Sequence, residues 1–200
     1  MIVIIEYNCG NVGSISNMLK KIGIECEVSS NHDTILSADK LILPGVGSYD
    51  NGMNKLKSKN LIDPLNEFVQ IKKKPILGIC LGMQLMSHSS EEGIEQGLSW
   101  IEEPVVSFKS QLDFTGTIPA MGWNYITIAK ENLLLNEENK RYYFVHSYFY
   151  KSNKYSILNT QINEFEYCAA FQKDNLFGVQ FHPEKSHKFG MELLQNFCSI

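Results

Sequence analysis

Residues 75–88 read PILGICLGMQLMSH, and this stretch decides the fold class of the 200-residue chain. Residues 75–79 form a short apolar run of the kind that a parallel strand buried on both faces presents. The run leads into GICLG at 78–82, where a glycine on either side of Cys80 permits a sharp turn from strand to helix. We expect residues 83–88 to continue as helix, so the pattern predicts a parallel sheet with an exposed thiol at its edge.

Apolar runs and helical periods alternate along the first half of the chain. Further short apolar runs lie at 2–5 and 40–43, and segments 12–22 and 61–71 have apolar residues at helical spacing. The second half instead carries aromatic or β-branched runs, typical of strands in partly antiparallel pairing, at 125–129, 142–150, 155–158, 165–171 and 176–181. Residues 186–198 have the spacing of a last helix. We predict a single α/β domain over 1–200, flavodoxin-like, with a mostly parallel central sheet, helices on both faces and an antiparallel portion.

Composition excludes several classes of protein. The hydrophobic fraction of 44% and the charged fraction of 20% are those of a globular protein, and a net charge of −4 argues against a nucleic-acid surface. The apolar start MIVII meets Glu6 too early for a signal peptide or a membrane span, so we expect a cytoplasmic protein with no membrane contact. Five scattered cysteines without a CxxC pair suggest neither a disulfide framework nor a zinc site.

Cys80 is the first candidate for chemistry. A thiol at a helix N-terminus gains thiolate character from the free N–H groups and the helix dipole. The backbone N–H of Leu81 would then point to where an oxyanion forms. A buried structural cysteine on a Gly-flanked turn fits GxCxG equally well, so the motif alone leaves both interpretations open.

The stretch GVQFHPEKSH at 178–187 supplies a partner for a thiolate. His182 should emerge at the end of a strand, and Glu184, two residues on, can orient its imidazole. His182, Glu184 and His187 are also three possible metal ligands, but H-x-E-x-x-H is not a helical zinc spacing and Pro183 prevents regular helix there. We therefore favour the catalytic interpretation and expect no metal.

Two glycine-rich segments follow predicted strands. In LILPGVGS at 41–48, the backbone N–H groups around Val46 and Gly47 could face either a phosphate or an oxyanion, and nothing local separates the two uses. NCGNVG at 8–13 faintly matches a dinucleotide fingerprint, but Asn8 stands where the first glycine is required. We expect no bound dinucleotide or other cofactor.

Taken together, GICLGMQ, FHPE and PGVG resemble the class I glutamine amidotransferases, which hydrolyse glutamine with a Cys-His-Glu triad and hand on ammonia. The order of IIEYNCGN, LPGVGSYD, PILGICLGMQL, SEEG, MGWN, YYFVHSY and GVQFHPEKS is similar to that in the glutaminase subunits of imidazole glycerol phosphate synthases, and the likeness covers roughly residues 2 to 198. The resemblance implies a catalytic triad of Cys80, His182 and Glu184.

The resemblance also implies binding residues. An oxyanion hole would come from Val46, Gly47 and Leu81. L-Glutamine would be held by its amino and carboxylate groups at Gln84, Glu92, Ser147 and Tyr148. Residues facing a partner protein would be Asn11, the turn Gly122-Trp123-Asn124, Tyr143 and Lys185. In this family the PGVG segment is often turned away from its active position until the partner and its ligand bind.

The implied partner is a (β/α)₈ barrel synthase that forms a heterodimer with this chain. The barrel uses the ammonia to make imidazole glycerol phosphate and an aminoimidazole carboxamide ribotide in histidine biosynthesis. Related subunits supply ammonia for amidino sugars of surface polysaccharides, and the ending FHPEKSHKFGM resembles that subgroup. The family usually has Asp where Glu6 stands, Gly near Cys9 and His where Ala120 stands. These departures lie near the expected partner face, so they leave open the identity of the partner and not the glutaminase chemistry.

Two other functions remain as alternatives. A cysteine hydrolase or peptidase of the same architecture typically carries His directly after the cysteine at the sharp strand-to-helix turn, called the nucleophile elbow. This chain has Leu81 at that position. A non-catalytic regulatory subunit would have lost a triad residue, and none is lost. The sequence favours the glutaminase.

Overall fold

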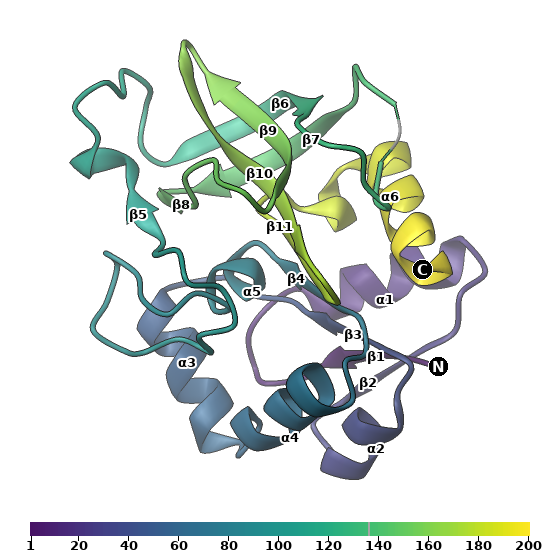
Figure 1. Cartoon of the computed structure of the whole chain (residues 1–200). Coiled ribbons are helices and arrows are strands. Elements are labelled where there is room, and N and C mark those ends of the chain that lie inside the picture. The colour runs from purple at the N-terminus through teal and green to yellow at the C-terminus, as the bar shows by residue number, and fades with distance from the viewer. Residues whose placement is uncertain (136) are drawn as a thin grey trace.

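A computed structural model of the chain describes residues 1–135 and 137–200 (Figure 1). Its strands are β1 (Ile2–Ile5), β2 (Cys26–Ser29), β3 (Lys40–Leu43), β4 (Ile76–Ile79), β5 (Val106–Ser107), β6 (Ala120–Ile128), β7 (Arg141–His146), β8 (Tyr148–Phe149), β9 (Ser156–Ile162), β10 (Phe165–Lys173) and β11 (Leu176–Val179). Its helices are α1 (Val12–Lys21), α2 (His32–Ser37), α3 (Tyr49–Ser58), α4 (Ile62–Asn66), α5 (Leu81–Gln84) and α6 (His187–Ser199), with shorter helical turns at Glu67–Ile71, Phe108–Ser110 and Pro183–Lys185.

Nine strands form one sheet in the order β2-β1-β3-β4-β11-β10-β9-β6-β7. The first five run parallel to one another, and β10, β9, β6 and β7 pair antiparallel. The parallel order 2-1-3-4 followed by a last strand is that of flavodoxin-like folds. The predicted fold class, a mostly parallel sheet with an antiparallel portion, is confirmed.

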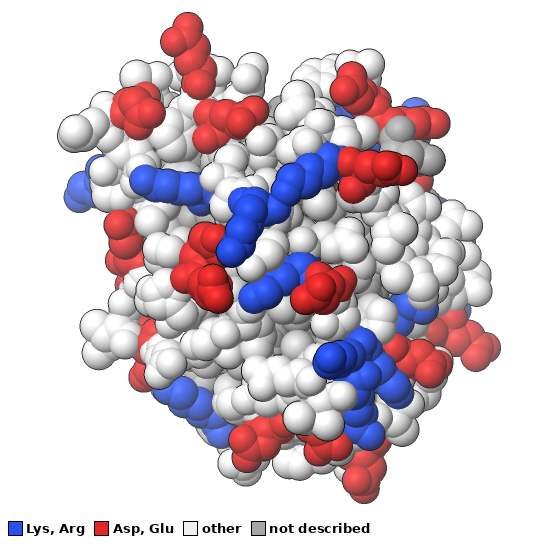
Figure 2. Space-filling view, viewed as in Figure 1, with Lys and Arg blue, Asp and Glu red and all other residues white. Residues whose placement is uncertain are grey.

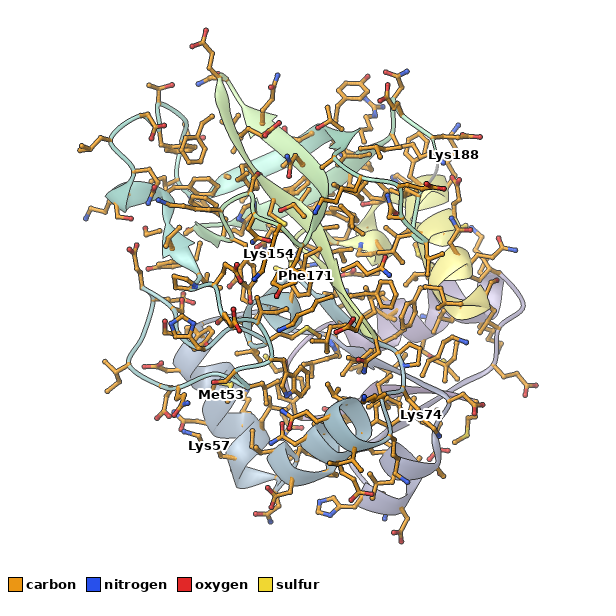
Figure 3. All side chains as sticks on the ribbon, viewed as in Figure 1. Met53, Lys57, Lys74, Lys154, Phe171 and Lys188 are labelled. Carbon is orange, nitrogen blue, oxygen red and sulfur yellow. The ribbon has the colours of Figure 1, made fainter. Side chains whose placement is uncertain are left out.

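Helices cover both faces of the parallel strands because successive side chains of a strand point to opposite faces. Ile2 and Ile4 of β1 pack into one core cluster with apolar residues of α1 and α6, and Val3 and Ile5 pack into the other with those of α2, α3 and α4. The two groups of helices lie on opposite sides of the sheet in Figure 1. Figure 3 labels Met53 of α3 and Phe171 of β10, both members of the second cluster.

Three adjacent parallel strands end at the same level of the sheet. Leu43 of β3 and Gly178 of β11 both pair with Gly78 of β4, so the segments after these strands start side by side. Ligands of open α/β sheets bind at the carboxyl ends of strands. The fold therefore brings together the chain after residues 43, 79 and 179.

Several local predictions were wrong. The helix expected at 83–88 ends at Gln84, because the amides of Leu98, Trp100 and Ile101 reach back to the carbonyls of Leu85 and Met86. The strand expected at 142–150 is broken at Ser147 into β7 and β8. The helix over 61–71 is α-helical only to Asn66 and continues as a π-helical turn.

No helix of the described chain is long and apolar enough to cross a membrane.

Candidate active site

Cys80 occupies a strained turn between β4 and α5. Its φ of 53° and ψ of −111° are unusual for a residue with a side chain. The glycines beside it leave room for this turn: a Cβ on Gly82 would lie 1.9 Å from the carbonyl oxygen of Leu43, and one on Gly78 would lie 2.7 Å from the amide nitrogen of Met83. The structure therefore contains the predicted turn from strand to helix, with α5 a single helical turn. The expectation of an exposed thiol is wrong, because Cys80 is only 7% exposed.

His182 and Glu184 form a buried pair directly after β11. His182 Nδ1 donates a hydrogen bond to Glu184 Oε1 at 2.8 Å, and both side chains are 2% exposed. The His182 carbonyl and backbone N–H are also held, by Ser186 Oγ at 2.6 Å and the Tyr143 carbonyl at 2.9 Å. Glu184 thus orients the imidazole, and Ser186 and strand β7 hold the backbone that carries it.

The free nitrogen of His182, Nε2, is buried and makes no well-formed hydrogen bond with any described residue, and neither does Glu184 Oε2. Burial lowers the pKa of His182, but the nearby Cys80 sulfur and the Glu184 carboxylate raise it by more, to about 9. The imidazole is therefore protonated at neutral pH and lies in the same cavity as Cys80, where it can give up a proton.

Gln180 also contacts the sulfur, a contact that sequence reasoning missed. Its Nε2 donates to Cys80 Sγ at 3.7 Å, and its Oε1 accepts from Gln84 Nε2 at 2.9 Å. Gln84 Nε2 donates as well to the Tyr148 carbonyl at 2.8 Å. Because Gln180 is fully buried, these bonds fix the direction of its amide. Nothing in the QFHPE pattern distinguishes this contact from an ordinary buried glutamine.

A cavity of about 510 Å³ opens over Cys80 and His182, a size that suits a small ligand. Its lining includes Val46, Gly47 and Leu81, predicted for the oxyanion hole, and Gln84, Glu92, Ser147 and Tyr148, predicted for glutamine binding. The remaining lining residues are Pro119, Val145, His146 and Lys185. Residues separated by up to 139 positions thus face one small volume.

Burial shifts the pKa values of one acidic and one basic side chain at the cavity. Burial raises the pKa of Glu92, whose Oε2 accepts a hydrogen bond from the Tyr49 amide at 2.8 Å. Burial also lowers the pKa of His146, to about 4. The neutral His146 donates from Nδ1 to the Tyr148 carbonyl at 2.9 Å and accepts at Nε2 from the Tyr167 hydroxyl at 3.2 Å. His146, which sequence reasoning missed, therefore holds Tyr148 in place.

The PGVG segment, Pro44–Gly47, leaves β3 and lies against the elbow. A Cβ on Gly45 would be 2.6 Å from the Gly82 amide nitrogen, so the two backbones touch. The Val46 and Gly47 amides donate no hydrogen bond within residues 1–135 and 137–200. Both residues are exposed at the cavity wall. N–H groups without a hydrogen-bond partner, at the wall of the cavity that Cys80 also lines, are what an oxyanion hole requires.

The segment Gly122-Trp123-Asn124 was expected to be a turn, and this is wrong: it lies within β6, paired with β7. Gly122 adopts a φ of +136° within this strand, a conformation that residues with a side chain rarely adopt. Trp123 and Tyr143 are direct partners across the two strands, with ring centroids 6.1 Å apart. Asn124 is next along the strand and so points to the opposite face.

The outward face of β6 and β7 is aromatic. Met121, Trp123 and Tyr125 are 64%, 40% and 63% exposed and alternate along β6. Lys185, at the cavity wall, lies over the Tyr143 ring at 5.6 Å. Asn11 is exposed at the start of α1. The face of β6 and β7 is thus continuous with the cavity through Lys185.

His187, which raised the question of a metal, is engaged elsewhere. It begins α6 and its ring stacks on Trp123 at 5.6 Å, while the Arg141 guanidinium lies 5.5 Å from the same indole. Among the described residues, no group of three His, Cys, Asp or Glu side chains is placed to hold a metal ion.

The charge on the face drawn in Figure 2 is mixed. Figure 2 shows Lys and Arg side chains interspersed with Asp and Glu on the face drawn, without a broad patch of one sign. A face of this kind offers no track for a phosphate backbone.

The family of glutamine amidotransferase class-I proteins matches residues 3–200. The chain therefore belongs to this class, as the motifs predicted. Its fold is also that of a solved structure described as a glutamine amidotransferase, at a TM-score of 0.77 and 16% identity over 100% of this chain and 98% of the other.

Within the class, the chain is similar to particular subunits. It is 52% identical to imidazole glycerol phosphate synthase subunit HisH 2 of Methanococcus maripaludis, over 98% of each chain. It is 45% identical to the subunit of the same name from Pseudomonas aeruginosa, over 100% of each chain.

Proposed function

We propose that this chain is a glutaminase subunit that hydrolyses L-glutamine to L-glutamate and ammonia through Cys80, His182 and Glu184. The observation that carries the proposal is the buried His182–Glu184 pair, joined at 2.8 Å, with Cys80 and His182 facing one cavity. A strained elbow cysteine, a base and an orienting carboxylate are the parts of a nucleophilic hydrolase.

In the first half of the reaction, the Cys80 thiolate attacks the side-chain amide carbon of glutamine. The amide oxygen becomes an oxyanion, which the free N–H groups of Val46, Gly47 and Leu81 would stabilise. The protonated His182 gives its proton from Nε2 to the amide nitrogen. The carbon–nitrogen bond breaks, ammonia leaves, and a γ-glutamyl thioester remains on Cys80.

In the second half, neutral His182 takes a proton from water as the water attacks the thioester. The carbon–sulfur bond breaks, and glutamate and the Cys80 thiolate are released. Glu184 stabilises the imidazolium in both halves and holds Nδ1 as the protonated nitrogen, leaving Nε2 to face the sulfur.

Substrate selection falls to the polar residues of the cavity. Gln84 and Tyr148 are tied to each other through the Tyr148 carbonyl, and Ser147 and Glu92 line the same wall. We assign Glu92 to the amino group of glutamine, because a carboxylate is the natural partner of an ammonium. Ser147 and Tyr148 are assigned to the α-carboxylate.

We further propose that the ammonia goes to a (β/α)₈ barrel synthase subunit, in a heterodimer that makes imidazole glycerol phosphate for histidine biosynthesis. The names of the relatives at 52% and 45% identity support this assignment. The aromatic face of β6 and β7, with Asn11 and Lys185, is the surface proposed to meet the barrel. An apolar face beside a cavity mouth suits a protein that must keep ammonia from water.

The proposal is tested by measuring glutamate release from glutamine with the purified chain alone, with its barrel partner, and with partner plus acceptor. We expect the last mixture to be fastest, and Cys80→Ala to lower its rate at least about 1,000-fold. Cys168→Ala removes a fully buried thiol outside the cavity and serves as the matched control. Wild-type protein without glutaminase activity in every mixture would exclude the proposed function.

The acceptor is identified in the same assay. The histidine-pathway intermediate is compared with a nucleotide-linked sugar acceptor, each with its own partner protein. Stimulation by the imidazole intermediate supports the histidine pathway, whereas stimulation only by the sugar system would move the chain to polysaccharide synthesis.

A further inference from the structure

We infer that Tyr7 and Cys9 are positioning residues for the oxyanion hole, because they hold the PGVG segment by two of its carbonyls. The inference rests on the proposed glutaminase function and deepens it. Both residues lie in the loop after β1, which has no part in the triad, and the NCGNVG pattern that contains Cys9 has no other use in the proposed reaction.

The contacts are direct. The Tyr7 hydroxyl donates to the Pro44 carbonyl oxygen at 2.5 Å, and Cys9 Sγ donates to the Val46 carbonyl oxygen at 2.9 Å. Tyr7 is fully buried and Cys9 is 5% exposed, so water does not compete for either bond. Burial, followed by the nearby Cys9 and Cys80 thiols, raises the pKa of Tyr7 well above its ordinary value, so the hydroxyl keeps the proton that it donates.

Fixing a carbonyl also fixes the amide of the next residue, since the peptide unit is planar. The Pro44 carbonyl shares its plane with the Gly45 N–H, and the Val46 carbonyl shares its plane with the Gly47 N–H. The two anchored planes therefore set the direction of the Gly47 donor outright. The peptide unit between Gly45 and Val46, which carries the Val46 N–H, lies between these two anchored planes.

Little else holds the outer part of the segment. The Val46 side chain is 44% exposed, and Gly47 and Ser48 are exposed as well. Gly47 adopts a φ of +98°. A Cβ placed on it would come within 4 Å of one described atom, Asn51 Nδ2 at 3.8 Å, so few atoms pack around this residue. Side-chain packing cannot fix the planes of such residues, so the two hydrogen bonds have to do so.

The anchoring loop is itself secured from α3 and its end. Lys59 Nζ donates to the Glu6 carbonyl at 3.2 Å, and Lys55 Nζ donates to the Asn8 carbonyl. Gly10, at a φ of +101°, lies so close to the segment that a Cβ there would be 2.8 Å from Pro44 Cβ. The loop is thus a fixed support rather than a free strand end.

The test uses Tyr7→Phe and Cys9→Ala, which remove only a hydroxyl and a sulfur. With partner and acceptor present, we expect each to lower kcat about tenfold while KM changes less than threefold, because a misdirected oxyanion donor weakens the transition state more than the bound substrate. Cys9→Ser keeps a donor and should recover at least half of the lost rate.

Two controls match the removed groups. Tyr142→Phe deletes another hydroxyl that donates to a backbone carbonyl, that of Phe189 at 3.3 Å, and Cys168→Ala deletes another buried thiol. Both are expected to keep wild-type kcat. Thermal unfolding of every variant shows how much of each is folded at the assay temperature.

A second readout separates positioning from general damage. Alkylation of Cys80 by iodoacetamide, followed on the Cys80 peptide, needs the thiolate but no oxyanion hole. We expect its rate to stay within twofold of wild type in Tyr7→Phe and Cys9→Ala. The inference is overturned if kcat per folded protein is unchanged in both variants, or if kcat and Cys80 alkylation fall together. Failure of the proposed function would appear differently, as an inactive wild type.

Discussion

The triad and the oxyanion segment lie against each other but are held in place by different means. Cys80 directly follows the buried strand β4, and His182 lies three residues after the end of the buried strand β11. Ser186 Oγ and the Tyr143 carbonyl hold the His182 backbone. The Pro44–Gly47 segment follows β3 just as directly, yet beyond Gly45 its residues are exposed, and its carbonyls bond to side chains more than 35 positions away. Strand ends fix the first set, whereas a few hydrogen bonds fix the second.

The difference indicates which part of the site can be adjusted. Moving Cys80 or His182 would require moving β4 or β11, which are buried on both faces. Rotating a peptide in the exposed segment breaks only single hydrogen bonds, such as that from Cys9 Sγ to the Val46 carbonyl, and moves no strand. If the site responds to a partner, the part that can move is therefore the oxyanion segment and not the triad. The four tests below check this difference between the rigid triad and the adjustable oxyanion segment.

The largest effect is expected from Gly45→Ala. Its Cβ would meet the backbone of Gly82 at 2.6 Å and Leu81 Cβ at 2.8 Å, so the segment must lift away from the elbow. We expect kcat to fall about 100-fold, the cost of losing an oxyanion donor, while Cys80 alkylation stays near wild type. Gly13→Ala is the control, since no atom of residues 1–135 and 137–200 outside its own helical turn lies within 4 Å of a Cβ there. Equal loss of alkylation and turnover would contradict the division.

Glu184→Gln tests the triad side. The amide keeps the shape but loses the charge that supports the His182 imidazolium. We expect a smaller fall in kcat than for Gly45→Ala, roughly tenfold for each unit by which the pKa of His182 falls. The pKa of His182 should fall as well, because Glu184 is one of the groups that raise it. Imidazole proton shifts in NMR spectra across pH 5 to 10 measure that change. Glu192→Gln, on α6, is the matched control, and an unchanged His182 pKa would show that Glu184 does not act on it.

Gln180→Leu should have a smaller effect on the same side. The variant removes the amide that donates to Cys80 Sγ, a hydrogen bond that stabilises the thiolate over the thiol. We expect Cys80 alkylation at pH 7 to slow about fivefold and its pH profile to shift upward. Gln172→Leu, at the far end of β10, serves as the comparison. An unchanged alkylation rate would show that Gln180 does not stabilise the Cys80 thiolate.

The last test concerns stability against pH and involves no change in turnover. The pKa of His182 is raised from 6.5 to about 9 in the folded chain, so its contribution is fully present below pH 6.5 and is lost as pH rises through about 9. Urea unfolding between pH 6.5 and 9 should therefore lose up to roughly 1 kcal/mol per pH unit relative to His182→Asn. Parallel pH profiles for the two proteins would show that the raised pKa is absent.

Much of the sheet could be predicted because its parallel strands are short apolar runs bounded by turn residues. The runs at 2–5, 40–43 and 75–79 match β1, β3 and β4 to within a residue. β2 was not predicted, because it is an edge strand with two exposed and two half-buried residues and no apolar run. α3 escaped because only four of its ten residues are buried, and one of those is a glycine.

The candidate site was predictable as far as its motifs reach. GICLG, FHPE and PGVG marked positions that the structure places around one cavity, and the roles of those residues remain predictions. The contacts of Gln180, Tyr7 and Cys9 were not predictable, because they join segments 37 to 100 positions apart through single hydrogen bonds. Only the pairing of strands decides which of these side chains meet.

The Trp123 indole, stacked on His187 and covered by Arg141, has a consequence for association. A large exposed side chain ordinarily loses rotational freedom when another protein covers it, at about 0.5–1.5 kcal/mol for each side chain immobilised. Trp123 is already confined in the free chain by its two neighbours. Most of that entropy has been lost during folding, so the indole is already rigid when a partner binds. Complexes formed through Trp123 should therefore differ more in their dissociation rates than in their association rates.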